Sequence, residues 1–176
     1  RVNLSDLASK GAEPFGYLLA CHWSPRCGWP EREAFVQGLE RDQSAFGVHL
    51  FGGDTVLTPG PASFSATMRG WVPRGGAASR SGAAVGDAVY VTGTIGDGWL
   101  GLQAALGHLS LEPERLDTLA EHYRRPMPRL AFGRVARDLA GAVMDVSDGL
   151  IADAGHIASA SGVAVSLDLD GLPRSA

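Results

Sequence analysis

Two aspartates, Asp145 and Asp148, lie in the run Asp-Val-Ser-Asp-Gly at 145–149, directly after an apolar segment. Carboxylates this close repel each other, and a carboxylate beside a buried segment is costly to desolvate unless it is paired or bound to a metal. Mg²⁺ suits such a place because it takes carboxylate oxygens and substrate phosphate oxygens together. The run therefore predicts a site for a cation or a phosphate at a helix start. Ser147 and Asp148 could instead merely cap that helix.

Two further aspartates have a similar setting of small and polar neighbours. Asp6 follows Asn-Leu-Ser at 3–5, and Asp54 follows Gly-Gly at 52–53. Each alone could be a helix cap or a turn residue, whereas the four aspartates together predict a metal–phosphate centre. Arg80 lies in a glycine-rich joint, where an arginine is either a solvated charge or a clamp on a phosphate.

Other nucleotide and metal motifs are weaker. The segment 96–101 matches G-x-G-x-x-G and precedes a predicted helix, but no strand ending in an acid follows about 20 residues later. We therefore predict that its glycines serve tight helix–strand packing. No P-loop motif is present, so a nucleotide site must be built differently. Four histidines show no metal-like spacing and are predicted to be structural: His49, His108, His122 and His156.

Cysteine count and charge narrow the class of protein. Cys21 and Cys27 are too few for a disulfide scaffold in 176 residues, which favours a reducing compartment, by default the cytoplasm. Their spacing fits no common zinc module, so 21–27 is predicted to be a tryptophan-containing loop. No apolar run is long enough to span a membrane, so no membrane partner is expected. The net charge of −4 lacks the basic excess of a typical nucleic-acid-binding protein.

Hydrophobic periodicity predicts a mixed α+β chain. Apolar residues make up 45% of the chain, enough for a core, and 24 glycines with 10 prolines indicate many turns. A shift to small residues places a domain boundary near 80–86. The helix predicted after Pro30 carries Phe35, Leu39 and Phe46 near one face. The predicted helices cover 7–12, 30–47, 98–107, 112–123, 127–140 and the segment after 147; the predicted strands cover 48–51, 64–72, 88–92, 142–144 and 163–169.

Five motifs occur in order along the chain: Asn3-Leu4-Ser5-Asp6-Leu7-Ala8, Gly52-Gly53-Asp54-Thr55, Arg80-Ser81-Gly82-Ala83 with Gly86-Asp87, Tyr123-Arg124-Arg125-Pro126, and Met144-Asp145-Val146-Ser147-Asp148-Gly149-Leu150. Together they resemble the thiamine-monophosphate kinase family of the aminoimidazole ribonucleotide synthetase-like superfamily. The resemblance runs from Arg1 to Pro173, and the last motif combined with Gly-Gly-Asp-Thr is far more specific than either alone.

The resemblance implies transfer of the γ-phosphoryl group of ATP to thiamine monophosphate, giving thiamine diphosphate and ADP by direct in-line attack. It implies several Mg²⁺ ions as cofactors and ATP as co-substrate. Positioning and charge neutralisation are then expected to supply most of the rate. The roles carried over by position are catalytic for Asp145 and Asp148, nucleotide-binding for Gly53, Asp54, Arg80 and Ser147, and metal-binding for Asp6, Asp54, Asp145 and Asp148.

The resemblance also implies a two-domain α+β architecture of the aminoimidazole ribonucleotide synthetase type, with both domains incomplete in this chain. Residues 1–83 are expected to be the remainder of an N-terminal ATP- and Mg²⁺-binding domain, and 84–176 the first part of a C-terminal αβ domain. A homodimer paired through the sheet of the first domain is expected.

Two alternatives stay open at this point. One is a sister enzyme of the superfamily that uses the same ATP–Mg²⁺ centre on another acceptor, such as a selenophosphate, aminoimidazole ribonucleotide or hydrogenase-maturation enzyme. The other is a non-catalytic nucleotide-binding module that keeps the fold and uses the acids only as caps.

Overall fold

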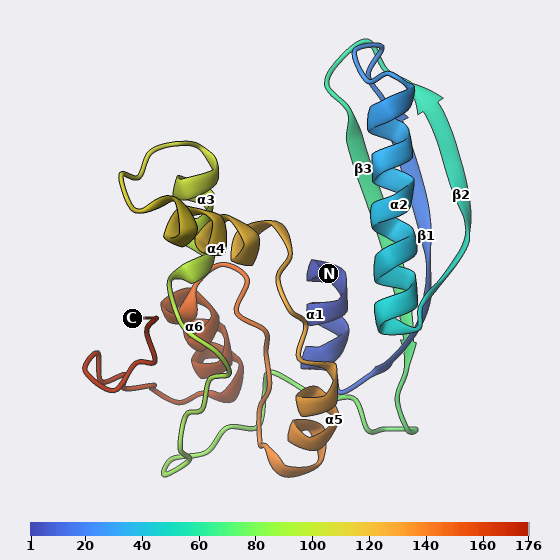
Figure 1. The fold of residues 1–176 in the computed structure, drawn as a ribbon. Coiled ribbons are helices and arrows are strands. Elements are labelled where there is room, and N and C mark those ends of the chain that lie inside the picture. Colours follow the sequence, from blue (N-terminus) through green and yellow to red (C-terminus); the bar gives the residue numbers. More distant parts are fainter. Residues whose placement is uncertain (176) are drawn as a thin grey trace.

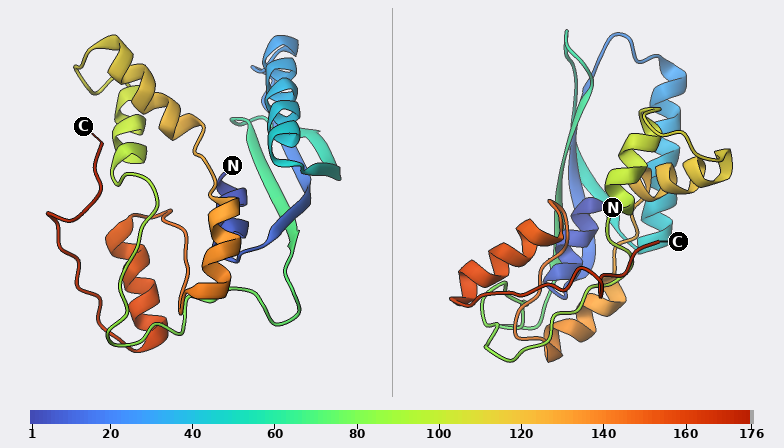
Figure 2. Two further views of the ribbon diagram at one scale, coloured as in Figure 1. Left: turned by 60° about the horizontal axis from the view of Figure 1, so that its bottom comes forward. Right: turned by 90° about the vertical axis from the view of Figure 1, so that its left-hand side faces the viewer.

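The computed structural model describes residues 1–175 and shows a mixed α+β chain, as the sequence predicts (Figure 1). One sheet and its covering helix stand apart from a second, helical half, and helix α1 lies between the two (Figures 1 and 2). The elements are α1 (Val2–Ser9), β1 (Glu13–Trp23), α2 (Trp29–Phe46), β2 (His49–Leu57), β3 (Ser63–Trp71), α3 (Asp97–Ala105), α4 (Pro113–Arg124), α5 (Leu130–Leu139) and α6 (Leu150–Ser161).

The sheet has the order β2-β1-β3, so the first strand is the central one. It pairs in parallel with β2 and antiparallel with β3. The sequence predicted no strand over 13–23 and a loop over 21–27; β1 contradicts both, the loop at Cys21–Trp23. The strand lacks simple alternation because its register slips in both ladders, at Tyr17/Leu18 against β2 and at Pro14/Gly16 against β3.

The core lies between this sheet and α2, which runs along one of its faces (Figure 1). The apolar face predicted for this helix is confirmed, because Phe35, Leu39 and Phe46 pack against the buried side chains of β1. Trp23 contacts the rings of Phe35 and Phe64 edge-on at centroid distances of 5.4 and 5.0 Å. Such contacts between aromatic rings add to the apolar burial that holds the helix on the sheet.

Strand β2 continues through the Gly-Gly-Asp-Thr motif, where the sequence predicted a turn after residue 51. Gly52 and Gly53 have φ values of +150° and +153°, a region that only glycine adopts readily. A Cβ atom on Gly53 would lie 1.8 Å from the carbonyl oxygen of Leu19 in β1. The two strands therefore pair at this point only because residue 53 has no side chain.

The remaining helices agree with the prediction, except that α1 covers Val2–Ser9 instead of 7–12 and so contains the residues expected to cap it. The three strands predicted at 88–92, 142–144 and 163–169 are wrong: the structure shows irregular backbone there. A strand needs a ladder of backbone hydrogen bonds, and these segments have isolated ones such as Val143 N–H to Ser79 O. Within residues 1–175, none of the helices has the length and apolar character needed to cross a membrane.

The G-x-G-x-x-G segment forms the start of α3, and Gly101 lies against the Leu119 carbonyl of α4. The predicted helix–strand packing is wrong, because 88–92 forms no strand; Gly101 instead allows close packing between two helices. Asp97 of this segment is buried. Burial alone would raise its pKa, yet hydrogen bonds from Ser175 and Thr94, with His122 nearby, hold the pKa below its usual value. Its carboxylate therefore serves the fold.

The two halves of the chain meet where α5 packs on α1 (Figures 1 and 2). Gly133 is buried, and a Cβ atom there would lie 2.1 Å from the carbonyl oxygen of Ala8. Two arginines of α5 reach back to the first half: Arg137 donates from Nη1 to the Gly11 carbonyl at 2.9 Å, and Arg134 pairs with Glu13. Backbone contact and charge pairing thus join the two halves.

The close approach at Gly53 predicts a difference between two neighbouring glycines. We expect Gly53→Ala to lower the free energy of unfolding by at least about 3 kcal/mol, because it adds a backbone clash to the strained φ. Gly52→Ala has a similar φ but no atom within 4 Å of the added carbon, so strain alone, about 1–2 kcal/mol, is expected. Urea unfolding followed by circular dichroism measures both; equal losses would contradict the account of the β1–β2 contact.

Candidate functional site

Two of the predicted metal ligands, Asp6 and Asp145, come from different halves of the chain and meet electrostatically. Asp6 lies on α1, and Asp145 lies between α5 and α6. The pKa of Asp6 is raised, first by partial desolvation and second by the Asp145 carboxylate, while Lys10 opposes both. Repulsion of this kind between two carboxylates is what a divalent cation relieves. The pair therefore fits the oxygen-ligand chemistry of Mg²⁺.

The segment 145–149 is shaped by a carboxylate that sequence analysis did not single out. The Oδ2 atom of Asp153 accepts three backbone N–H groups, from Ser147 at 2.9 Å, Asp148 at 3.1 Å and Gly149 at 3.1 Å. Gly149 is the N-cap of α6, and no side chain caps this helix, so the alternative that Ser147 and Asp148 are caps is wrong. Because these N–H groups are taken up by Asp153, they favour a cation over a phosphate as the ligand of this segment.

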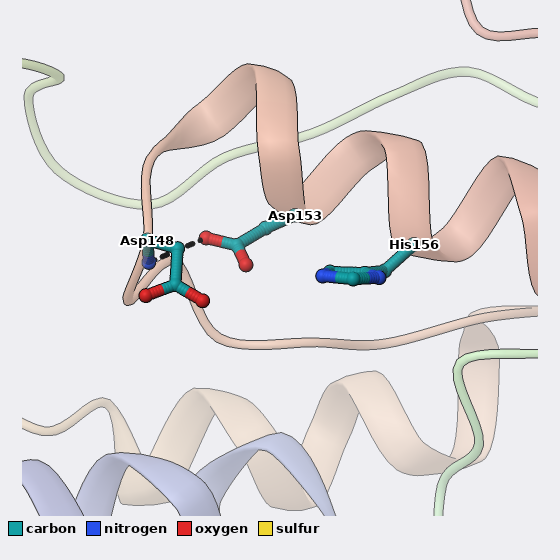
Figure 3. Close-up of side chains that lie close together, drawn as sticks. All are labelled: Asp148, Asp153 and His156. Carbon is teal, nitrogen blue, oxygen red and sulfur yellow. Dashed lines mark hydrogen bonds between the residues drawn. The ribbon is translucent and has the colours of Figure 1, made fainter.

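Asp148 lies beside two residues of α6, Asp153 and His156. Figure 3 shows the side chains of Asp148, Asp153 and His156 gathered at the start of α6. One ligand atom from each, two carboxylate oxygens and one ring nitrogen, lie within 4.8 Å of one another. His156, predicted to be structural, thus stands in a group that could hold a metal ion.

The loop with Arg80 is held close to the segment that leads into Asp145. The Ser161 hydroxyl at the end of α6 accepts the N–H groups of Gly82 and Ala83, each at 3.1 Å, and donates to the Arg80 carbonyl at 3.4 Å. The neighbouring Ser79 carbonyl accepts from Val143 N–H at 2.7 Å. Helix α6 therefore positions both predicted loops, one at each of its ends.

Asp54 and Gly53 lie on β2, in the same half of the chain as Asp6. The Asp54 side chain is exposed, and its Oδ1 accepts the N–H of Thr55 at 2.8 Å. Within residues 1–175, no hydrogen bond or ion pair joins Asp54 to the other predicted ligands. Hydrogen bonds and electrostatics thus connect Asp6, Asp145, Ser147 and the Arg80 loop, and within the described residues Asp54 has no such connection.

Three contributors to the site escaped sequence analysis: Asp153, His156 and Ser161. A usable signal existed for the first two, because residues three apart on a helix share a face and both follow Asp148 closely. Ser161 carries no such signal, since its partners lie about 80 residues earlier in the chain.

Comparison with known proteins shows the family of the chain. Residues 1–72 match the family model of the AIR synthase related protein, N-terminal domain, and residues 84–176 match that of its C-terminal domain. The chain is 49% identical to the thiamine-monophosphate kinase of Caulobacter vibrioides over 99% of its own length and 49% of that protein. It is 43% identical to the one from Salmonella typhimurium over 99% of its length and 53% of that protein. The chain thus spans about half the length of the curated relatives it matches.

Solved structures show the same relation. The crystal structure of thiamine-monophosphate kinase from Stenotrophomonas maltophilia superposes with a TM-score of 0.90 at 40% identity, covering 99% of this chain and 56% of that one. AaThiL complexed with AMPPCP and TMP gives 0.91 at 31% identity, covering 99% and 55%. Escherichia coli HypE, at 22% identity with a TM-score of 0.81, shares the fold. On these matches the chain belongs to the AIR synthase related protein family.

Proposed function

We propose that the protein carrying this chain transfers the γ-phosphoryl group of ATP to the phosphate of thiamine monophosphate. The observation that carries the proposal is the electrostatic influence of Asp145 on Asp6 across the packed helices α1 and α5, with the Arg80 loop hydrogen-bonded to the segment before Asp145. The similarity to thiamine-monophosphate kinases, one of which is solved with AMPPCP and TMP, supports the choice of acceptor. A phosphate oxygen of the acceptor attacks the γ-phosphorus in line, the bond to ADP breaks, and thiamine diphosphate forms.

The side chains in this proposal bind and orient rather than react. Asp6 and Asp145 would hold Mg²⁺, and Asp148 and Asp54 are the other proposed metal ligands. Magnesium supplies neutralisation of the charge that builds on the transferred phosphoryl group. Arg80 and Ser147 would contact ATP, with Gly53 and Asp54 as the nucleotide-binding part of β2. The acceptor is already an anion, so no side chain has to remove a proton from it.

We also propose a homodimer and a cytoplasmic location. The sheet face opposite α2 exposes several large apolar side chains, and Phe15 contacts both Phe51 and Trp71 there at centroid distances of 5.0 and 5.5 Å. A contiguous exposed apolar patch of this kind favours a protein partner, and a second copy would cover it with the same patch. Both cysteines are unpaired, which suits a reducing compartment.

The central test is product formation by the complete gene product supplied with ATP, Mg²⁺ and thiamine monophosphate. Thiamine diphosphate and ADP are expected in equal amounts. We expect Asp145→Asn to lower kcat at least about a hundredfold while the circular dichroism spectrum stays unchanged, because the neutral amide holds Mg²⁺ poorly. Asp117→Asn, an exposed acid on α4, is the matched control and should leave kcat unaltered. ADP without thiamine diphosphate would point to another acceptor, and an active Asp145→Asn would overturn the assigned role.

The apolar sheet face predicts that one tryptophan controls the oligomeric state. Trp71→Asp should convert the dimer to a monomer in light scattering after gel filtration, because it places a charge in the buried face. Trp29→Asp is the control: Trp29 is 76% exposed, against 66% for Trp71, but it lies at the start of α2, away from this face. A Trp71→Asp protein that stays dimeric would place the interface elsewhere.

A further inference from the structure

Only one of the two oxygens of the Asp153 carboxylate has hydrogen-bond partners. Its Oδ2 accepts three backbone N–H groups, as described above. Its Oδ1 is buried and has no hydrogen-bond partner, and the residue is only 2% exposed. An unpaired carboxylate oxygen in such a place costs free energy that a bound ligand would recover.

The unpartnered oxygen faces the two side chains best able to share a cation with it. Figure 3 shows Oδ1 of Asp153 directed into the space between the Asp148 carboxylate and the His156 ring. Asp148 and His156 are both exposed, so their side chains can rotate without disturbing packing. A divalent ion bonds oxygen and nitrogen at about 2.0–2.3 Å, so ligand atoms up to about 4.5 Å apart can share one ion. The observed limit of 4.8 Å needs only a small rotation of the exposed pair.

We propose that Asp148, Asp153 and His156 form a binding site for one divalent cation. Asp153 contributes the buried oxygen, Asp148 a second oxygen, and His156 a ring nitrogen. A nitrogen ligand disfavours Mg²⁺ and suits a first-row transition ion such as Mn²⁺ or Zn²⁺. The site differs in composition from the all-oxygen pair of Asp6 and Asp145.

A cation at this site would order the 145–149 run. Asp153 already holds the backbone of residues 147–149 through Oδ2, and a cation on Oδ1 would tie the Asp148 side chain to the same carboxylate. The ion would thus fix the direction of a side chain that belongs to the 145–149 run. The inference stands on the geometry of α6 alone and does not require thiamine monophosphate to be the acceptor.

Manganese, used as the probe without nucleotide, tests the proposal on the complete gene product. Binding is measured from the loss of the free Mn²⁺ electron paramagnetic resonance signal, and pulsed measurements report nitrogen coupled to the bound ion. We expect a coupling typical of a directly bound imidazole. His156→Ala should remove this coupling and weaken Mn²⁺ binding at that site at least about tenfold. Alanine is a good helix former on the exposed face of α6, so the fold should persist.

Two variants sharpen the result. His108→Ala, an exposed histidine bonded to Gln103, should leave the imidazole coupling intact. Asp153→Asn should weaken Mn²⁺ binding in the same way as His156→Ala. Bound Mn²⁺ without nitrogen coupling, a coupling that persists in His156→Ala, or no Mn²⁺ binding at all would each overturn the proposal. Because no ATP or thiamine monophosphate is present, these outcomes are separate from any failure of the kinase assay.

Discussion

The contact between α1 and α5 is the constraint on which the candidate site depends. Gly133 lets the backbone of α5 rest against the Ala8 carbonyl, and Arg137 fixes the crossing by its bond to the Gly11 carbonyl. Asp6 is carried on α1, and Asp145 follows α5 by a short irregular segment. If the helices were further apart, the electrostatic repulsion between Asp6 and Asp145, which lie 139 positions apart in the sequence, would be weaker. Packing of small residues therefore sets the electrostatics of the site.

Helix α6 holds two further segments of the site in place. Its first turn carries Asp153, which gathers the N–H groups of the 147–149 backbone, and its last turn carries Ser161, which holds the Arg80 loop. The backbone donors near the helix start are therefore satisfied internally. The side chains left to bind a ligand there are carboxylates and an imidazole, which are cation ligands. Phosphate would have to be held through those cations and through Arg80.

Local signals in the sequence were sufficient for several elements. The helix α2 was predictable because Pro30 starts it, Gly47 ends it in the left-handed conformation, and its apolar face repeats with helical spacing. The strand β3 was predictable from strict alternation. The central strand β1 was not, because Pro14, Gly16 and two register slips hide its period.

The site was predictable in its residues more than in its arrangement. The four aspartates and Arg80 were singled out from their small and polar neighbours, but which of them approach one another depends on packing between segments far apart in the sequence. Nothing local indicates that the Asp145 carboxylate acts on Asp6 or that Asp153 takes up the backbone donors. The strands expected at 88–92, 142–144 and 163–169 failed for the same reason, since a strand exists only where another segment pairs with it.

The most direct test of the central claim is a double-mutant cycle on Mg²⁺ affinity. Calorimetry would compare the complete gene product with Asp6→Asn, Asp145→Asn and the double variant, each with a non-hydrolysable ATP analogue present. If the two carboxylates share one cation across the two halves, the double variant should lose little more affinity than either single variant, because the first substitution already breaks the site. Losses that simply add would show that Asp6 and Asp145 act independently, and would contradict the account.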